Sequence, residues 1–134
     1  MKYYLENIEN LEENQFFVFG SNLAGIHGAG ASKQARSFGA CLGVGTGFSG
    51  RSYAIPTTDH NIKTLPLDDI QEYINLFMKV AGDNNPEFNF YVTKIGCGIA
   101  GYKDSEIAPM FKSAPDNCYF HIDWFDYLED IIYE

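Results

Sequence analysis

Two short apolar runs in this chain end abruptly in glycine-rich loops, and this pattern restricts the fold more than any other feature. The first run, residues 16–19, is followed by a glycine, a polar pair and three further glycines within residues 20–30. The second run, residues 88–94, leads into three glycines within residues 96–101. A buried strand that ends in this way brings main-chain N–H groups close to an anion, and a helix after the loop directs its free N–H groups at the same place. Two such loops indicate a nucleotide or a dinucleotide-like ligand.

Strand-like and helix-like segments alternate along the chain. Strands are predicted at residues 3–5, 16–19, 52–55 (closed by Pro56), 88–94 and 118–121. Helices are predicted at residues 29–39, 67–81, 105–112 (with Asp104 as N-cap) and 124–133, and the glycine-rich residues 41–50 are expected to form a mobile loop. Because the core strands are nearly all apolar, the pattern predicts a mainly parallel sheet covered on both faces. Ligands of such sheets bind beyond the C-terminal ends of the strands, where both glycine loops fall.

Length and charge narrow the class of protein. The 134 residues are expected to form a single domain, 1–134, and a hydrophobic fraction of 46% is typical of a globular core. No apolar run is long enough to span a bilayer, and the first residues lack the apolar core of a signal peptide, which predicts a cytoplasmic protein without a membrane partner. A net charge of −9 argues against a nucleic-acid duplex, but a local backbone site still accommodates a small anion.

The cysteines predict neither a disulfide framework nor a metal site. Cys41, Cys97 and Cys118 are odd in number and share no CxxC spacing, so reduced thiols without metal or cofactor are expected. Cys97 lies between two glycines, but no basic partner is identifiable by spacing, which disfavours a nucleophile. The first loop also lacks the Lys-Ser/Thr pair of a phosphate-binding Walker motif, because Ala31 and Ser32 follow its last glycine.

Three polar side chains of the loops each have two interpretations. Asn22 either orients a ribose hydroxyl or a water, or it caps its own turn. His27 is either a general base or ligand contact, or a loop histidine at the surface. Asp59, after the third predicted strand, either reaches an adenine or ribose or belongs to a solvated turn. Asn22 and His27 are thus the candidate catalytic residues.

Several motifs resemble a family of small macrodomain-like proteins found in phages and bacteria. The resemblance covers about residues 15–112, most of the chain. Its motifs are Gly20-Ser21-Asn22-Leu23-Ala24-Gly25, His27-Gly28-Ala29-Gly30-Ala31, Ser52-Tyr53-Ala54-Ile55-Pro56-Thr57, Leu65-Pro66-Leu67, Thr93-Lys94-Ile95-Gly96-Cys97-Gly98-Ile99-Ala100-Gly101-Tyr102 and Ile107-Ala108-Pro109. More distantly, the two glycine loops are similar to the phosphate loops of ADP-ribose-binding macrodomains.

This resemblance implies a three-layer α/β/α macrodomain-like fold with a mainly parallel central sheet. It also implies binding of ADP-ribose or a related NAD-derived nucleotide, with the diphosphate between the two loops. The predicted ligand contacts are Gly20, Ser21, Asn22, Gly25, His27, Gly28, Ala29, Gly30, Gly96, Cys97, Gly98, Ile99, Ala100, Gly101 and Tyr102.

Two alternative functions are compatible with the sequence. The first is an ADP-ribosyl hydrolase in which water attacks the anomeric carbon, with Asn22 placing the water and His27 assisting. The second is an oligomeric structural or interaction protein, suggested by nine tyrosines and by an aromatic C-terminal segment through which a homo-oligomer would form. A pure binding module is favoured, because no carboxylate is placed in a loop for general-base work.

Overall fold

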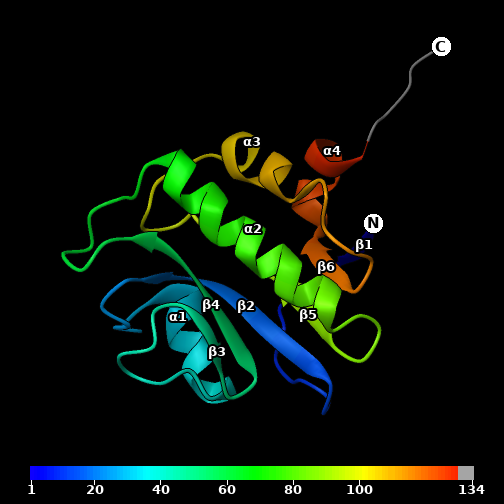
Figure 1. The fold of residues 1–134 in the computed structure, drawn as a ribbon, viewed down its shortest axis with the longest axis horizontal. Helices are drawn as coiled ribbons and strands as arrows, with labels where there is room; N and C mark the ends of the chain where they lie inside the picture. Colours follow the sequence, from blue (N-terminus) through cyan, green and yellow to red (C-terminus); the bar gives the residue numbers. More distant parts are fainter. Residues whose placement is uncertain (130–134) are drawn as a thin grey trace.

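The computed structural model describes residues 1–129, and a six-stranded sheet lies at its centre (Figure 1). The strands are β1 (Lys2–Tyr4), β2 (Gln15–Asn22), β3 (Gly47–Ser49), β4 (Ser52–Thr58), β5 (Asn89–Val92) and β6 (Cys118–His121). Their order across the sheet is β1-β6-β5-β2-β4-β3. Neighbouring strands are parallel except for β3, which pairs antiparallel with β4 at one edge. The expected α/β class with a mainly parallel sheet is therefore confirmed.

Helices cover the two faces of the sheet unequally, as the arrangement in Figure 1 shows. One face carries α1 (Gly30–Ala35) and the 3-10 turn η1 (Arg36–Phe38). The other face carries α2 (Leu67–Asp83), α3 (Asp104–Ile107), η2 (Ala108–Phe111), η3 (Ile122–Trp124) and α4 (Phe125–Leu128). The result is the predicted three-layer α/β/α arrangement.

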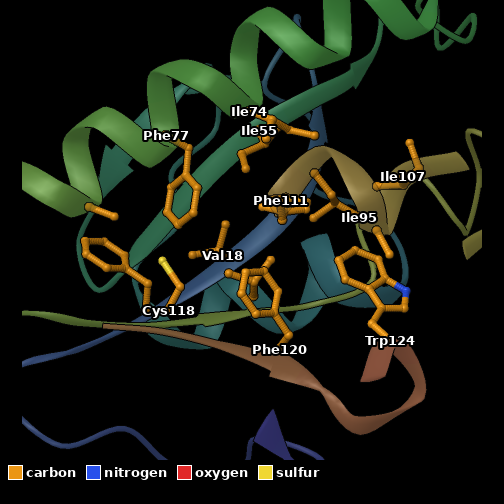
Figure 2. Packing of buried hydrophobic residues seen from close by; sticks show 14 of the residues in the cluster. Val18, Ile55, Ile74, Phe77, Ile95, Ile107, Phe111, Cys118, Phe120 and Trp124 are labelled. Carbon is orange, nitrogen blue, oxygen red and sulfur yellow. The ribbon is translucent and has the colours of Figure 1, made fainter. Parts of the chain in front are cut away.

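The apolar run in β2 supplies both layers of the core. Phe17 and Phe19 pack on the α1 side, whereas Val18 belongs to the larger cluster under α2. Successive side chains of a strand point to opposite faces, so a strand covered on both sides has to be apolar throughout. Figure 2 shows Val18 in the larger cluster with Phe77 of α2 and Trp124 from the C-terminal segment.

Helix α2 covers the sheet through a single apolar stripe. Ile70, Ile74, Phe77 and Ala81 are fully buried, and they recur every three or four residues along the helix. Pro66 precedes the first turn, where its missing N–H leaves no hydrogen bond unmade. The helix predicted over residues 67–81 is thus present and slightly longer.

The prediction of a mobile loop at residues 41–50 was wrong for its last part, because Gly47–Ser49 forms β3. This strand pairs with β4 only as far as Ala54. Beyond Ala54 this side of β4 has no paired strand until the isolated bridge between Thr58 and Thr64, so Pro56 is tolerated and the strand continues to Thr58 instead of closing there. The longer β4 carries Thr57 and Thr58 to the same sheet edge as the end of β2.

Three predicted helices are shorter in the structure or continue as a 3-10 turn. The helix predicted at residues 105–112 is α3 followed by η2 and spans Asp104 to Phe111. The helix predicted at residues 29–39 is α1 followed by the tighter turn η1. The helix predicted at residues 124–133 begins one residue later, and α4 ends at Leu128; residues 130–133 lie outside the described residues. Trp124 itself is completely buried against Phe111 and Phe120, so it belongs to the core.

Among residues 1–129, no helix is long and apolar enough to cross a bilayer.

Candidate functional site

A cleft of about 910 Å³ lies at the C-terminal edge of the sheet, where the loops after β2 and β5 face each other. The two loops meet because β2 and β5 are direct neighbours in the sheet. Among the predicted ligand contacts, the cleft is lined by Gly20, Ser21, Asn22, Gly28, Ala29, Gly30, Gly96, Cys97, Gly98, Ile99, Ala100 and Tyr102. Gly25, His27 and Gly101 do not line it.

Asn22 shapes the first loop through its side-chain amide. Its Nδ2 donates to the carbonyl of Ile26 at 2.7 Å, and its Oδ1 accepts from the Ile26 N–H at 3.0 Å. The side chain thus caps its own turn, the second of the two interpretations considered for this residue. One N–H and the carbonyl oxygen of the amide are engaged with Ile26, so the side chain fixes the backbone of the loop.

We expect Asn22→Ala to lower both the stability of the protein and its affinity for the ligand. We expect no turnover in either the wild type or this variant. The free energy of unfolding should fall by about 1–2 kcal/mol, because two hydrogen bonds to the Ile26 backbone are lost. Ligand affinity should fall by about 1–3 kcal/mol as the loop relaxes. Thermal denaturation and calorimetry measure the two effects. Asn75→Ala, on the exposed surface of α2, is the control and should change neither. Unchanged stability of Asn22→Ala would contradict the capping role.

Gly25 has a structural reason for its identity. Its φ is +70°, and an added Cβ would lie 2.4 Å from the carbonyl carbon of Gly43. The Gly43 N–H donates to the Gly25 carbonyl at 3.0 Å, and Ser21 Oγ donates to the carbonyl of Gly45. The first loop is therefore pressed directly onto the backbone of residues 43–45. Gly25 therefore packs against residues 43–44 and does not line the cleft.

His27 lies in the interior and away from the cleft. Only 5% of the residue is exposed, its Nε2 is 3.0 Å from the Cys41 carbonyl oxygen, and its ring meets Phe19 edge-on. Its Nδ1 has no partner among the described residues. This position joins the first loop to residues 39–42 and gives the imidazole no access to a ligand in the cleft.

The second loop is held by its own backbone and by a hydrogen bond to the segment ahead of α2. The N–H of Tyr102 donates to the Gly96 carbonyl at 2.9 Å, and that of Gly101 donates to the Gly98 carbonyl at 3.0 Å. The Tyr102 hydroxyl donates to the Leu65 carbonyl at 2.7 Å and fastens the loop to the start of α2. Within the described chain, the N–H groups of Gly98, Ile99 and Ala100 have no hydrogen-bond partner. The loop is therefore rigid but keeps donors available at the cleft.

Gly28 and Gly98 are the two glycines of the cleft at which the surrounding structure leaves open space for a side chain and φ is not positive. Both line the cleft and are exposed, and a Cβ added at either would meet no atom within 4 Å. Neither has a positive φ. Like the second loop, the first has unpaired donors in the described structure: the N–H groups of Gly28, Ala29 and Gly30. Each loop thus has a glycine at the cleft, where the absence of a side chain allows a ligand to come close to the backbone.

Asp104, which the sequence pattern predicted as a helix N-cap, is a carboxylate that lines the cleft. Lys103 holds the N-cap position predicted for Asp104, and Asp104 lies in the first turn of α3. Its Oδ1 accepts from Trp124 Nε1 at 2.9 Å. Burial acts to raise the pKa of Asp104, but the hydrogen bonds from Trp124 and Cys97 outweigh it and lower the pKa below its usual value. No local pattern marks this site, because Trp124 lies 20 residues further along the chain.

Cys97 faces the cleft as a thiol and not as a thiolate. Burial, followed by the hydrogen bond to the Asp104 carboxylate, raises the pKa of Cys97 to about 12. At pH 8 a thiol with that pKa is ionised in about one molecule in ten thousand. The structure thus supports the expectation that Cys97 is not a nucleophile.

We expect iodoacetamide at pH 8 to alkylate Cys41 well before Cys97. Cys41 is exposed, whereas the ionised form of Cys97 is suppressed by burial and by the neighbouring carboxylate. Peptide mass spectrometry over time measures both rates. Protein unfolded in denaturant is the control, in which the two rates should become similar. Equal rates in the folded protein would mean that Cys97 is activated.

Further residues complete the cleft without having been predicted as ligand contacts. Four of them are Thr57, Thr58, Ile62 and Tyr127. Ile62 has a φ of +61°, the only positive value for a non-glycine residue among the described residues. For an L-residue this conformation costs roughly 1–2 kcal/mol.

The described residues contain no group of three or more His, Cys, Asp or Glu side chains suited to a metal ion.

The fold is similar to that of a solved protein. The structure matches one described as Thermosipho africanus DarTG in complex with ADP-ribose, with a TM-score of 0.56 and 13% sequence identity. The match covers 90% of this chain and 40% of that chain, so this chain spans less than half of the other's length. No protein-family model matches the sequence, and neither does any curated protein. At 13% identity the likeness establishes a common macrodomain-like fold.

Proposed function

We propose that the cleft binds ADP-ribose or a related NAD-derived nucleotide, with the diphosphate between the two glycine loops. The observation that carries this proposal is the placement of Gly28 and Gly98, which line one cleft beside unpaired backbone N–H groups. The ADP-ribose held by the Thermosipho africanus protein, whose fold is similar, supports the same class of ligand.

Backbone donors suit a phosphate ligand in a chain of this charge. The net charge of −9 gives no general attraction for anions, so a phosphate has to be held by local contacts. Two lysines, Lys94 and Lys103, also line the cleft, and Lys94 is paired with Asp123 at 3.1 Å. The N–H groups of the two loops supply fixed donors in addition to these side chains.

Binding is favoured over hydrolysis by the side chains at the cleft. Asp104 is the only carboxylate that lines it in the described chain. The lowered pKa of Asp104 makes it a weak general base, and two donors already hold it. Asn22 is engaged with Ile26, and His27 lies outside the cleft. We therefore propose a binding module, with ADP-ribosyl hydrolysis as the competing function.

The test combines calorimetry with a turnover assay. We expect heat and thermal stabilisation with ADP-ribose, NAD or ADP, and no release of ADP-ribose from a mono-ADP-ribosylated protein. The absence of any binding at millimolar ligand would refute the proposal. Clear turnover that Asp104→Asn abolishes would establish the hydrolase instead.

Three further predictions accompany this proposal. They are a cytoplasmic location, a relation to the phage and bacterial family, and self-association through the C-terminal segment. Trp124 is buried in the core, but Phe125 and Tyr127 remain more than a third exposed and are apolar residues of that segment that a second copy could contact. Native mass spectrometry tests both self-association and a co-purified nucleotide.

A further inference from the structure

Three isoleucines stand exposed around the same cleft. Ile26 is 52% exposed, Ile62 43% and Ile99 69%, and all three line the cleft. They come from three separate segments: the first glycine loop, the turn after β4 and the second glycine loop. Single exposed apolar residues are common on protein surfaces, but several around one concave site are typical of a ligand contact.

Hydrogen bonds tie the three segments together at the end of β4. The Leu23 N–H donates to the Thr58 carbonyl at 3.1 Å and joins the first loop to this strand. Thr58 forms a β-bridge with Thr64, at the far side of the turn that carries Ile62. Thr64 Oγ1 in turn donates to the carbonyl of Ala100, next to Ile99, at 2.8 Å. The three segments that carry the isoleucines are therefore linked to one another by hydrogen bonds.

The turn that carries Ile62 is built around Asp59. One carboxylate oxygen of Asp59 accepts from the N–H groups of Asn61 at 2.8 Å and Lys63 at 2.9 Å, and the Ile62 N–H donates to the Asp59 carbonyl at 3.1 Å. These contacts hold Ile62 at its φ of +61°, where asparagine or glycine would be less strained. A strained, β-branched and exposed residue at a ligand cleft points to a role in binding.

We propose that Ile26, Ile62 and Ile99 form an apolar collar that holds the flat face of a heteroaromatic ring of the bound nucleotide. This inference rests on the proposed function and names the part of the ligand that lies at the β4 end of the cleft. The collar makes ring-bearing nucleotides the preferred ligands.

A ring suits this end of the cleft better than a sugar. The isoleucines offer no hydrogen bonds, so hydroxyl groups placed against them would lose their water partners without replacement. Two nearby polar side chains already have partners within the protein, since Asn22 bonds the Ile26 backbone and Thr57 Oγ1 donates to the Ser21 carbonyl at 3.3 Å. A planar ring needs only contact area on its faces.

The test is Ile62→Asn, titrated by calorimetry with ADP-ribose and with NAD. We expect about tenfold weaker binding, because the ring loses apolar contact. The melting temperature of the free protein should stay within about 2 °C of the wild type, because relief of the left-handed strain offsets the loss of partial burial. Weakening with ADP-ribose places the adenine ring at the collar, whereas weakening with NAD alone places the nicotinamide ring there.

Two control variants separate the collar from general surface effects. Ile62→Leu keeps an apolar side chain and should bind within about threefold of the wild type. Leu42→Asn alters an apolar residue that is 80% exposed and outside the cleft, and it should leave both affinities unchanged. Wild-type affinity of Ile62→Asn for both nucleotides overturns the collar alone. A parallel fall in melting temperature and affinity assigns Ile62 a structural role and also overturns it. Absence of binding by the wild type overturns the proposed function as well.

Discussion

Gly98→Val is expected to abolish nucleotide binding while leaving the stability of the fold unchanged. The added side chain meets no protein atom near its Cβ, and the backbone at Gly98 has no positive φ, so the native loop accommodates valine. A phosphate that approaches the free N–H groups of Gly98 and Ile99 would instead collide with the β-branched side chain. The loss of two charge-assisted hydrogen bonds corresponds to about 3 kcal/mol or more, which is over 100-fold in affinity.

Gly28→Val provides an independent arm of the same experiment. Gly28 is also exposed at the cleft without a neighbour for an added Cβ, so the same loss of binding is expected from the opposite loop. Gly82→Val is the matched control, because Gly82 has similar space but lies near the end of α2, outside the cleft. Calorimetry and thermal melting are measured on all three variants. Normal binding by a stably folded Gly98→Val would show that the second loop does not hold the phosphate.

Gly45→Ala is expected to destabilise the protein by roughly 2–4 kcal/mol, the largest stability effect among these variants. An added Cβ would lie 2.2 Å from the carbonyl oxygen of Asn22 and 3.1 Å from that of Leu23. These are backbone atoms at the end of β2, so they can move only if the first glycine loop moves with them. Ligand affinity should therefore fall together with stability, in contrast to Gly98→Val.

Gly43→Ala is the matched control for this prediction. Gly43 has a φ of +89° but no atom within 4 Å of an added Cβ, so its cost is limited to backbone strain of about 1 kcal/mol. Urea denaturation of both variants measures the difference. If Gly45→Ala were no less stable than Gly43→Ala, the contact between residues 43–45 and the first loop would be too loose to support the cleft.

Sequence patterns predicted a helix or strand best where its formation depends on residues a few positions apart. The apolar run at residues 16–19 lies within β2, and the stripe of Ile70, Ile74 and Phe77 marked α2, because burial on a strand or helix is written in residues a few positions apart. The length of β4 was underestimated at Pro56, because the tolerance for proline depends on where the neighbouring β3 ends.

In the candidate site, too, the sequence predicted the features that depend on adjacent residues and left open those that depend on tertiary contacts. Glycines that follow an apolar strand identified both loops, since close approach of backbone to a ligand needs small residues in sequence. The roles of Asn22 and His27 were left open, because the choice depends on whether each side chain turns toward the cleft or into the protein. The structure places the Asn22 amide on Ile26 and the His27 ring against Phe19.

The sequence by itself determined an α/β chain with two glycine-rich loops at one edge of a mainly parallel sheet, because strand burial and turn formation depend on adjacent residues. Only the tertiary structure decided which side chains share the cleft. Asp104 meets Trp124 across 20 residues, Ser21 meets Gly45 across 24, and Thr64 meets Ala100 across 36. These contacts arise from the packing of separate elements, and no periodicity or spacing along the chain encodes them.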